Sequence, residues 1–141
     1  MWKAPAEGGA AVQVTRQEGR EAFESPDGKM VYYTRQIPAA GIWQVPAAGG
    51  EETQVIDHGS QGGWSMTPEG IGLFRFGDSG PAIEFYRFST GALSQVAAAL
   101  PKEARIATAS PYFAISRDLR WMLYTQIDRV ESDIMLVENF R

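Results

Sequence analysis

The stretch Trp43-Gln44-Val45-Pro46-Ala47-Ala48-Gly49-Gly50 repeats an earlier one, Trp2-Lys3-Ala4-Pro5-Ala6-Glu7-Gly8-Gly9, after an interval of 41 residues. A short β-type segment follows each copy, at residues 12–14 and 54–56. Self-similarity with a period between 20 and 50 residues is the mark of a repeat architecture, in which each repeat is one small supersecondary unit. This repeat therefore decides which fold we expect for the whole chain.

A second recurring element is a tight turn followed by an aromatic strand. Its best copy is Ser25-Pro26-Asp27-Gly28-Lys29, where Pro at the second position and Asp-Gly behind it favour a β-turn. The stretch Thr67-Pro68-Glu69-Gly70 is its counterpart in the second unit. A third copy, Ser116-Arg117-Asp118-Leu119-Arg120, lies 91 residues after the first and lacks the Pro and the Gly. Each unit is thus predicted to contain a hairpin at the same place.

Alternating, β-branched and aromatic segments bounded by turn residues predict four short strands in each unit. No segment shows a persuasive helical period. About 40 residues and four antiparallel strands per unit are typical of a β-propeller blade. We therefore expect an all-β fold with three four-stranded antiparallel blades, spanning approximately residues 12–45, 53–88 and 94–138. Residues 2–5 are expected to be an orphan outer strand of a preceding blade, and three blades make an incomplete ring.

The turn at residues 25–33 and the outer strand at 43–50 resemble the WD40-like repeats of the TolB family of bacterial β-propellers. The resemblance covers nearly the whole chain and is strongest in the first unit. It implies the C-terminal part of a larger bacterial regulatory or TolB-like protein, since such propellers often follow a DNA-binding or kinase domain. A short protein whose two copies form a homodimer, and so complete a six-blade ring, is the alternative.

The function we expect is that of a non-catalytic module for protein interaction or sensing, with an unidentified protein partner. A net charge of −4 argues against binding of a nucleic-acid backbone. No catalytic residue, cofactor or metal is predicted, because the chain has no Cys and a single His. Two alternatives stay open: an accessory gating propeller of a prolyl-oligopeptidase-like hydrolase, and a propeller that binds a carbohydrate or another small ligand.

The chain as given is expected to be soluble, in either the cytoplasm or the periplasm. Its N-terminus lacks the apolar core of a signal peptide. The longest purely apolar run is residues 96–100, far short of the roughly 20 residues that span a bilayer. We therefore expect no contact with a membrane.

Two short motifs invite a catalytic interpretation. Gly77-Asp78-Ser79-Gly80-Pro81 resembles the nucleophile loop of chymotrypsin-like proteases, but it falls at a predicted hairpin. Asp57-His58-Gly59-Ser60 could indicate acid–base or metal chemistry, and we interpret it as a turn with an exposed His58. The recurring acids Asp27, Glu69 and Asp118 could line a cation site, although an acid that caps its own turn explains the recurrence more simply.

One asymmetry between loops bears on partner binding. The turns at residues 25–29 and 46–51 are short, whereas the loops at 16–21, 57–62, 100–111 and 127–133 are longer, charged and dissimilar. Repeat proteins usually carry such loops on a binding face. We therefore predict a partner-binding surface whose candidate residues are Arg16, Arg20, His58, Arg105 and Arg129.

Overall fold

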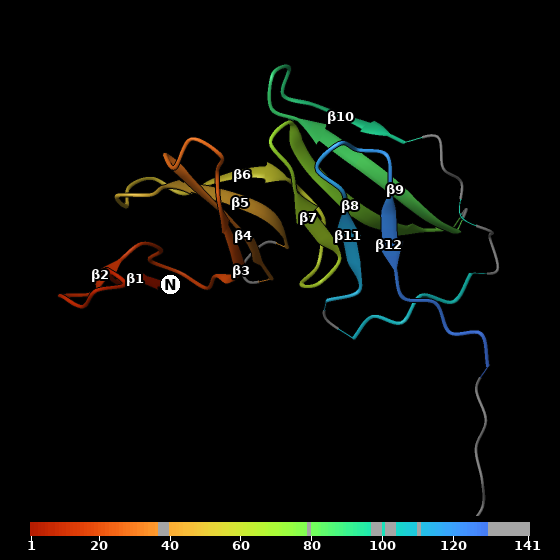
Figure 1. Ribbon diagram of the computed structural model, residues 1–141, viewed down its shortest axis with the longest axis horizontal. Coiled ribbons are helices and arrows are strands. Elements are labelled where there is room, and N and C mark those ends of the chain that lie inside the picture. The colour runs from red at the N-terminus through yellow and green to blue at the C-terminus, as the bar shows by residue number, and fades with distance from the viewer. Residues whose placement is uncertain (37–39, 79, 97–99, 101–103, 110, 130–141) are drawn as a thin grey trace, which may run out of the picture.

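The computed structural model describes residues 1–36, 40–78, 80–96, 100, 104–109 and 111–129, and these residues form an all-β fold without a helix (Figure 1). Two sheets have four strands and two have a pair of strands. The all-β class and the four-stranded antiparallel sheets are confirmed. The strands are β1 (Trp2–Lys3), β2 (Val12–Gln13), β3 (Arg20–Glu24), β4 (Met30–Arg35), β5 (Gly41–Pro46), β6 (Thr53–Ile56), β7 (Trp64–Met66), β8 (Gly70–Gly77), β9 (Gly80–Arg87), β10 (Ala92–Gln95), β11 (Phe113–Ile115) and β12 (Met122–Tyr124).

Each sheet is an antiparallel meander in which strands adjacent in the sequence pair with each other. The first four-stranded sheet is β3-β4-β5-β6 and the second is β7-β8-β9-β10. The pair β1-β2 precedes them, and the pair β11-β12 follows. In Figure 1 the red β1-β2 pair, the first four-stranded sheet and the second follow one another across the molecule, and β11 and β12 overlap the second sheet in this view.

The grouping of the strands differs from the expected one by a single strand. Residues 53–56 were expected to open the second unit, but β6 pairs with β5 and closes the first sheet. The cause is the turn at Gly49 and Gly50, whose φ angles of 85° and 153° bring the chain back along β5. The sheets therefore span residues 20–56 and 64–95, where the expected units spanned 12–45 and 53–88.

The same regrouping of strands by one position accounts for how the first and last described strands pair. Residues 2–5 were expected to be an orphan strand, but β1 pairs with β2. Trp2 lies opposite Gln13 as Trp43 lies opposite Gln54, so this pair repeats the β5-β6 pair. The expected third unit, 94–138, is divided: residues 92–95 close the second sheet, while the strand expected at 134–138 lies outside the described residues.

The recurring turns have the same hydrogen bonds in the first and third units. The Ser25 hydroxyl donates to Asp27 Oδ1 at 2.7 Å and accepts from the Met30 amide at 2.9 Å. Ser116 makes the matching bonds to Asp118 Oδ1 and from the Trp121 amide, at 2.6 and 3.0 Å. These acids therefore cap their own turns. Hydrogen bonding from the serines lowers the pKa of Asp27 and Asp118.

The turn of the second unit is shorter. The Thr67 hydroxyl accepts from the Gly70 amide, and the Glu69 carboxylate instead binds Arg87 at 2.9 Å. Aligning the three turns shows which strand residues are equivalent in successive units. In each unit the third residue before the turn lies opposite a residue of the following strand, and these cross-strand pairs are equivalent to one another. These pairs are Ala22 with Tyr33, Trp64 with Leu73, and Phe113 with Tyr124.

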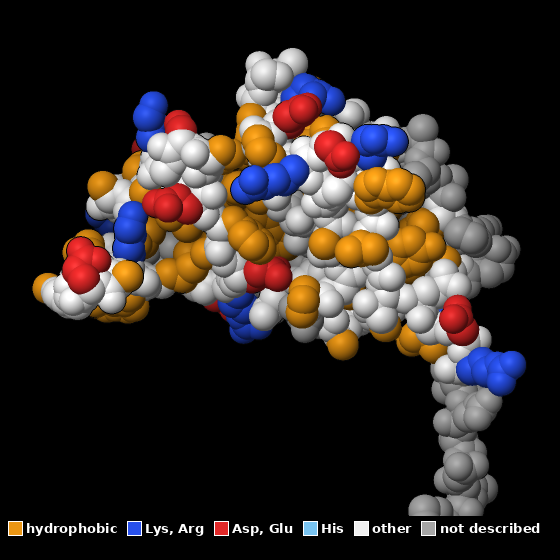
Figure 2. Space-filling view, viewed as in Figure 1, with side chains coloured by type: hydrophobic (Ala, Val, Ile, Leu, Met, Phe, Trp, Pro, Cys, Tyr) orange, Lys and Arg blue, Asp and Glu red, His pale blue; other side chains and the backbone are white. Residues whose placement is uncertain are grey.

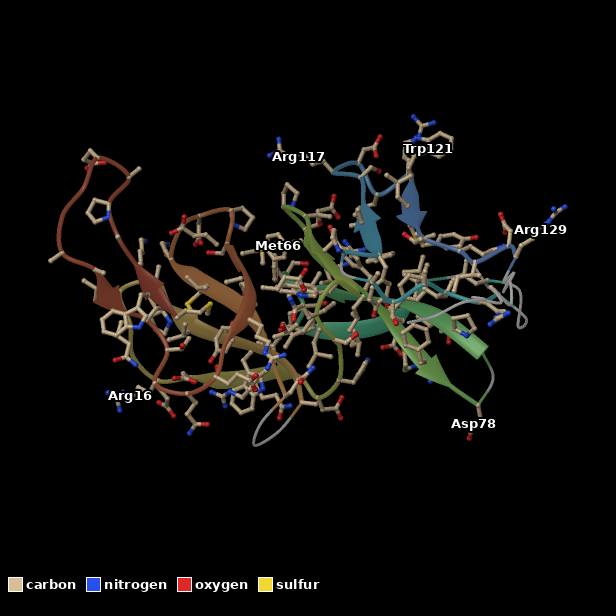
Figure 3. All side chains as sticks on the ribbon, turned by 90° about the horizontal axis from the view of Figure 1, so that it is seen from below. Arg16, Met66, Asp78, Arg117, Trp121 and Arg129 are labelled. Atoms are coloured by element: carbon tan, nitrogen blue, oxygen red, sulfur yellow. The ribbon has the colours of Figure 1, made fainter. Side chains whose placement is uncertain are left out.

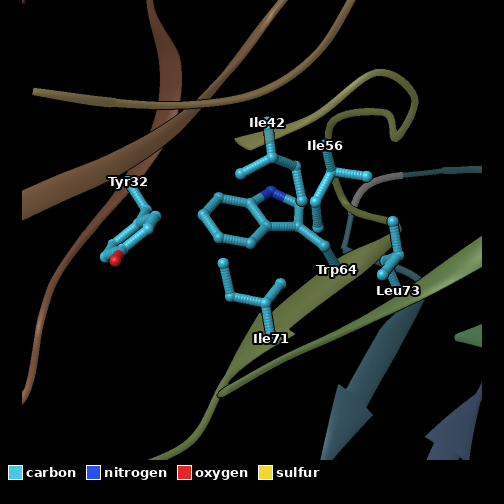
Figure 4. Close-up of a cluster of buried hydrophobic side chains, with 6 residues drawn as sticks. All are labelled: Tyr32, Ile42, Ile56, Trp64, Ile71 and Leu73. Atoms are coloured by element: carbon cyan, nitrogen blue, oxygen red, sulfur yellow. The ribbon is translucent and has the colours of Figure 1, made fainter. Parts of the chain in front are cut away.

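The core lies between sheets (Figure 4). Trp64 is 2% exposed and packs among buried residues of both four-stranded sheets: Tyr32, Ile42 and Ile56 from the first, Ile71 and Leu73 from the second. Successive residues of a strand point to opposite faces. Accordingly Tyr33, next to Tyr32, packs toward Val14 of the preceding pair.

The second sheet repeats this arrangement. Leu73 faces the first sheet, while the adjacent Phe74 packs on Tyr112 and Phe113 of the following segment. The central strands of both four-stranded sheets thus bury both faces, each against a neighbouring sheet. A polar contact also crosses the boundary between the two four-stranded sheets: the Glu21 carboxylate on β3 accepts a hydrogen bond from the Trp64 indole N–H at 2.7 Å.

Candidate functional site

Two clusters of polar side chains lie on the central strands. Arg35 ends β4, and Arg75 lies at the corresponding place on β8, five residues after Met30 and Gly70 respectively. Arg35 lies two residues after Tyr33, and Arg75 lies two residues after Leu73. Residues two apart in a strand point to the same face, so both arginines lie on the face that points toward the preceding sheet. Each arginine forms an ion pair. The repeat therefore places a charged cluster at each of two sheet boundaries.

The first cluster surrounds Glu52, which directly precedes β6. Its carboxylate accepts hydrogen bonds from Arg35 Nη2, from the Tyr33 hydroxyl at 2.8 Å and from the Arg16 amide at 2.6 Å. Arg35 is 3% exposed, and its guanidinium carbon lies 3.8 Å from the centroid of the Trp43 ring. Burial and the hydrogen bond to Glu52 raise the pKa of Tyr33. Glu52 thereby ties two loops to β4.

A hollow of about 380 Å³ opens beside this cluster, lined by Arg16, Gln17, Arg35, Trp43 and residues 50–52. Among the described residues, Arg35 Nε and Trp43 Nε1 are buried without a hydrogen-bond partner. Both oxygens of Glu52 are already engaged. Apart from these two nitrogens, the polar groups of the cluster named above bind one another, which is the arrangement of a structural anchor.

The second cluster joins the two four-stranded sheets through His58. Its Nε2 lies 2.6 Å from Glu84 Oε2 on β9, and its Nδ1 lies 2.7 Å from Asp57 Oδ1. Arg75 Nε donates to the other oxygen of Glu84 at 2.7 Å. His58 lies in the connection between β6 and β7, as expected, but its side chain is only 31% exposed and contacts the neighbouring sheet.

This geometry gives stability a specific pH dependence. Burial works to lower the pKa of His58, but the hydrogen bonds and charges of Asp57 and Glu84 outweigh it and raise the pKa above its ordinary value. A raised pKa in the folded state means that the stabilisation is complete below about pH 6.5, the unfolded value, and is lost as pH rises through the folded pKa. Because His58 is partly exposed, we expect the loss to be below about 1 kcal/mol.

The prediction is checked by measuring the free energy of unfolding against pH for the wild type and for His58→Gln, in which the dependence should disappear. Asp57→Asn, which keeps the contact with Glu84, should retain part of it. Since the chain has one histidine, its NMR titration directly reports the folded pKa. A titration midpoint at or below about 6.5 would contradict the assignment.

The other predicted binding residues lie in separate surroundings. Arg16 is exposed and contributes its backbone amide, whereas Arg20 Nε pairs with Glu18 at 2.7 Å. The Arg105 carbonyl accepts from the Ile127 amide at 2.8 Å, which ties its loop to the segment after β12. Arg16 and Arg129 lie at opposite ends of the molecule in Figure 3. The five residues therefore do not form one compact site.

The protease-like motif is a hairpin. Gly77 lies opposite Gly80 at the end of the β8-β9 ladder, and Asp78 follows Gly77 in the connection between the two strands. Ser79 itself lies outside the described residues. In Figure 3 Asp78 projects at the tip of this hairpin. Among the residues that the structure describes, no three or more His, Asp or Glu side chains could jointly hold a metal ion.

The sequence did not predict a hollow that lies at the end of the sheets where the recurring turns are. Its volume is about 250 Å³, and corresponding residues of three successive turns, Pro26, Pro68 and Arg117, contribute to its lining. Phe23 and Met66 supply apolar surface. In Figure 3 Arg117 and Trp121 lie on the side opposite Arg16 and Asp78, and Met66 lies between the two sides. The recurrence of the turn was the available signal, but it does not show which turn residues share a surface.

Comparisons with known proteins return no assignment. No family model matches the sequence, and no curated protein matches it either. The described part of the chain has no helix long and apolar enough to cross a membrane. A proposal for the function therefore rests on the repeat and on the packing of the sheets.

Proposed function

We propose that the chain is a run of β-propeller blades that acts as a non-catalytic module for protein interaction or sensing, within a larger bacterial regulatory or TolB-like protein. The proposal is supported chiefly by the burial of both faces of the central strands of each four-stranded sheet against neighbouring sheets. Blades bury their surface in this way, through contacts with the preceding and following units.

The polar clusters support a binding module over an enzyme. Glu52, Glu84 and both ring nitrogens of His58 are occupied by partners within the fold. Their contacts hold loops and sheets together, which accounts for them without a reaction. Function is then expected in the surface loops, which differ from unit to unit on a repeated scaffold.

The hollow at the turn end favours a second candidate, the binding of a small ligand. Prolines and aromatic or aliphatic side chains line it, together with Glu24 and Arg117. A few polar groups beside apolar surface are typical of small-molecule sites. Ligand-induced shifts in an NMR spectrum that centre on Met66 and Phe23 would favour this candidate over a protein partner.

The protein-interaction proposal is tested by quantitative affinity enrichment from a bacterial extract, with the enriched proteins identified by mass spectrometry. The variant Arg16→Ala/Arg105→Ala/Arg129→Ala removes three exposed charges from the variable loops. The control, Lys29→Ala/Arg117→Ala/Arg120→Ala, removes three exposed charges from the hairpin turns. We expect the loop variant alone to bind the enriched partner at least about tenfold more weakly, a loss of about 1.4 kcal/mol. Unchanged binding would refute the loop surface, and no reproducible partner would refute the interaction function.

A further inference from the structure

Buried polar groups that lack a hydrogen-bond partner mark one place in the fold as a candidate ligand site. Figure 2 shows hydrophobic side chains in several separate patches on one face of the molecule, with charged side chains of both signs between them. The hollow of about 380 Å³ beside Glu52 is of another kind, because Arg35 and Trp43 line it and each has a buried N–H group without an acceptor. A buried donor without an acceptor is costly, so two of them side by side call for an explanation.

The second sheet shows which group such donors bind. Trp43 on β5 and Glu84 on β9 are equivalent, since each lies opposite a glutamine of the following strand and opposite an equivalent residue of the preceding strand. Arg75 Nε donates to the Glu84 carboxylate at 2.7 Å. In the first sheet the Trp43 indole stands at the place of that carboxylate and adds a second donor. Arg35, the equivalent of Arg75, therefore has no acceptor for its Nε.

The loops beside the two arginines differ as well. Asp57 and His58 lie 41 residues after Arg16 and Gln17, which is the interval of the repeat. His58 Nε2 lies 2.6 Å from the Glu84 carboxylate and so occupies the space beside it. Arg16 and Gln17 are exposed instead and line the hollow. The first boundary thus has a positive side chain where the second has an acid.

The charges around the hollow indicate the class of ligand. Two arginines and two glutamates line it, and Arg35 and Glu52 neutralise each other in an ion pair. The other two, Arg16 and Glu51, are exposed. This balance favours a ligand with a single negative charge over a polyanion such as phosphate. A carboxylate is also the group that Glu84 supplies at the equivalent place in the second sheet.

We propose that this hollow binds a small organic monocarboxylate, whose oxygens accept hydrogen bonds from Arg35 Nε and Trp43 Nε1 and pair with the Arg16 guanidinium. Both nitrogens are buried, so entry of the ligand requires the Trp43 ring to tilt away from the Arg35 guanidinium carbon, which lies 3.8 Å from the ring centroid. The inference rests on the sensing function proposed above, for which it names the ligand.

The test is a titration of the isotope-labelled protein with sodium propionate, followed by NMR of the four indole N–H groups. Trp43→Phe identifies the Trp43 resonance. We expect a saturable downfield shift of this resonance with a dissociation constant of about 1–10 mM, because the indole gains a charged acceptor. The indoles of Trp2, Trp64 and Trp121 should change little. Propionamide, at the same ionic strength, should leave all four unchanged.

Arg16→Ala removes the guanidinium but keeps the backbone amide that binds Glu52. It should weaken propionate binding about fivefold, whereas Arg117→Ala, which removes an exposed arginine of the third turn, should bind like the wild type. The proposal is overturned if Trp43 shows no saturable shift, if propionamide shifts it equally, if inorganic phosphate binds more tightly, or if Arg16→Ala keeps full affinity. Affinity enrichment measures partner binding separately, so failure of this site and failure of the interaction function are distinguishable.

Discussion

Replacing Trp64 with alanine is expected to lower the free energy of unfolding by about 3–5 kcal/mol. The indole is 2% exposed and fills the boundary between the two four-stranded sheets. It also makes an edge-to-face contact with Phe23, at a centroid distance of 4.8 Å, and donates to Glu21. The substitution therefore leaves a cavity and removes the indole hydrogen bond to the Glu21 carboxylate, which keeps its bond from the Gly62 amide. Since domains are stable by only about 5–15 kcal/mol, the variant is expected to be close to unfolding at room temperature.

Urea titration measures this effect, with Trp121→Ala as a matched control. Trp121 is 68% exposed, so its removal should change the free energy of unfolding by no more than about 0.5 kcal/mol. Equal losses for the two tryptophans would contradict the placement of Trp64 between the sheets.

Replacing Glu52 with glutamine is expected to destabilise the fold by about 3 kcal/mol. Arg35 is buried, and without the carboxylate its charge has no compensating ion pair. Glu51→Gln, a change at the exposed neighbouring residue, should stay within about 0.5 kcal/mol of the wild type. The double variant Arg35→Met/Glu52→Gln should recover part of the loss, because it removes the unpaired charge as well.

The pH dependence provides a second measurement of the same contact. Burial works to raise the pKa of Glu52, but hydrogen bonds from the Arg16 amide and Tyr33 and the charge of Arg35 lower it overall. A lowered pKa means that the stabilisation is present above about pH 4.3, the unfolded value, and is lost as pH falls through the folded pKa. The wild type should lose this contribution in acid and Glu52→Gln should not. Parallel stability curves would refute the prediction.

The sequence predicted most of the strands because their signals are local. Alternating apolar residues mark the strands. Ser-x-Asp turns mark the recurring hairpin in the first and third units, where the same hydrogen bonds occur at Ser25 and Ser116. Which strands share a sheet is not a local property. The segment at 53–56 has equal strand character whether it closes one sheet or opens the next, and the turn at Gly49 and Gly50 decides between them.

The candidate site was predicted less well for a similar reason. His58 and Glu84 are 26 residues apart and meet only because neighbouring sheets stack. Glu21 and Trp64 are 43 residues apart and meet across the same boundary. Loop composition alone therefore indicated an exposed histidine.

The most direct test of the account is a nuclear Overhauser spectrum of the protein with labelled isoleucine methyls and aromatic rings. Stacked sheets predict cross-peaks between the Trp64 indole and the methyls of Ile42 and Ile56, which belong to the other sheet. They also predict cross-peaks between the rings of Phe74 and Phe113, whose centroids lie 5.0 Å apart. Cross-peaks confined to residues of the same sheet, with none across either boundary, would contradict the stack and the proposal built on it.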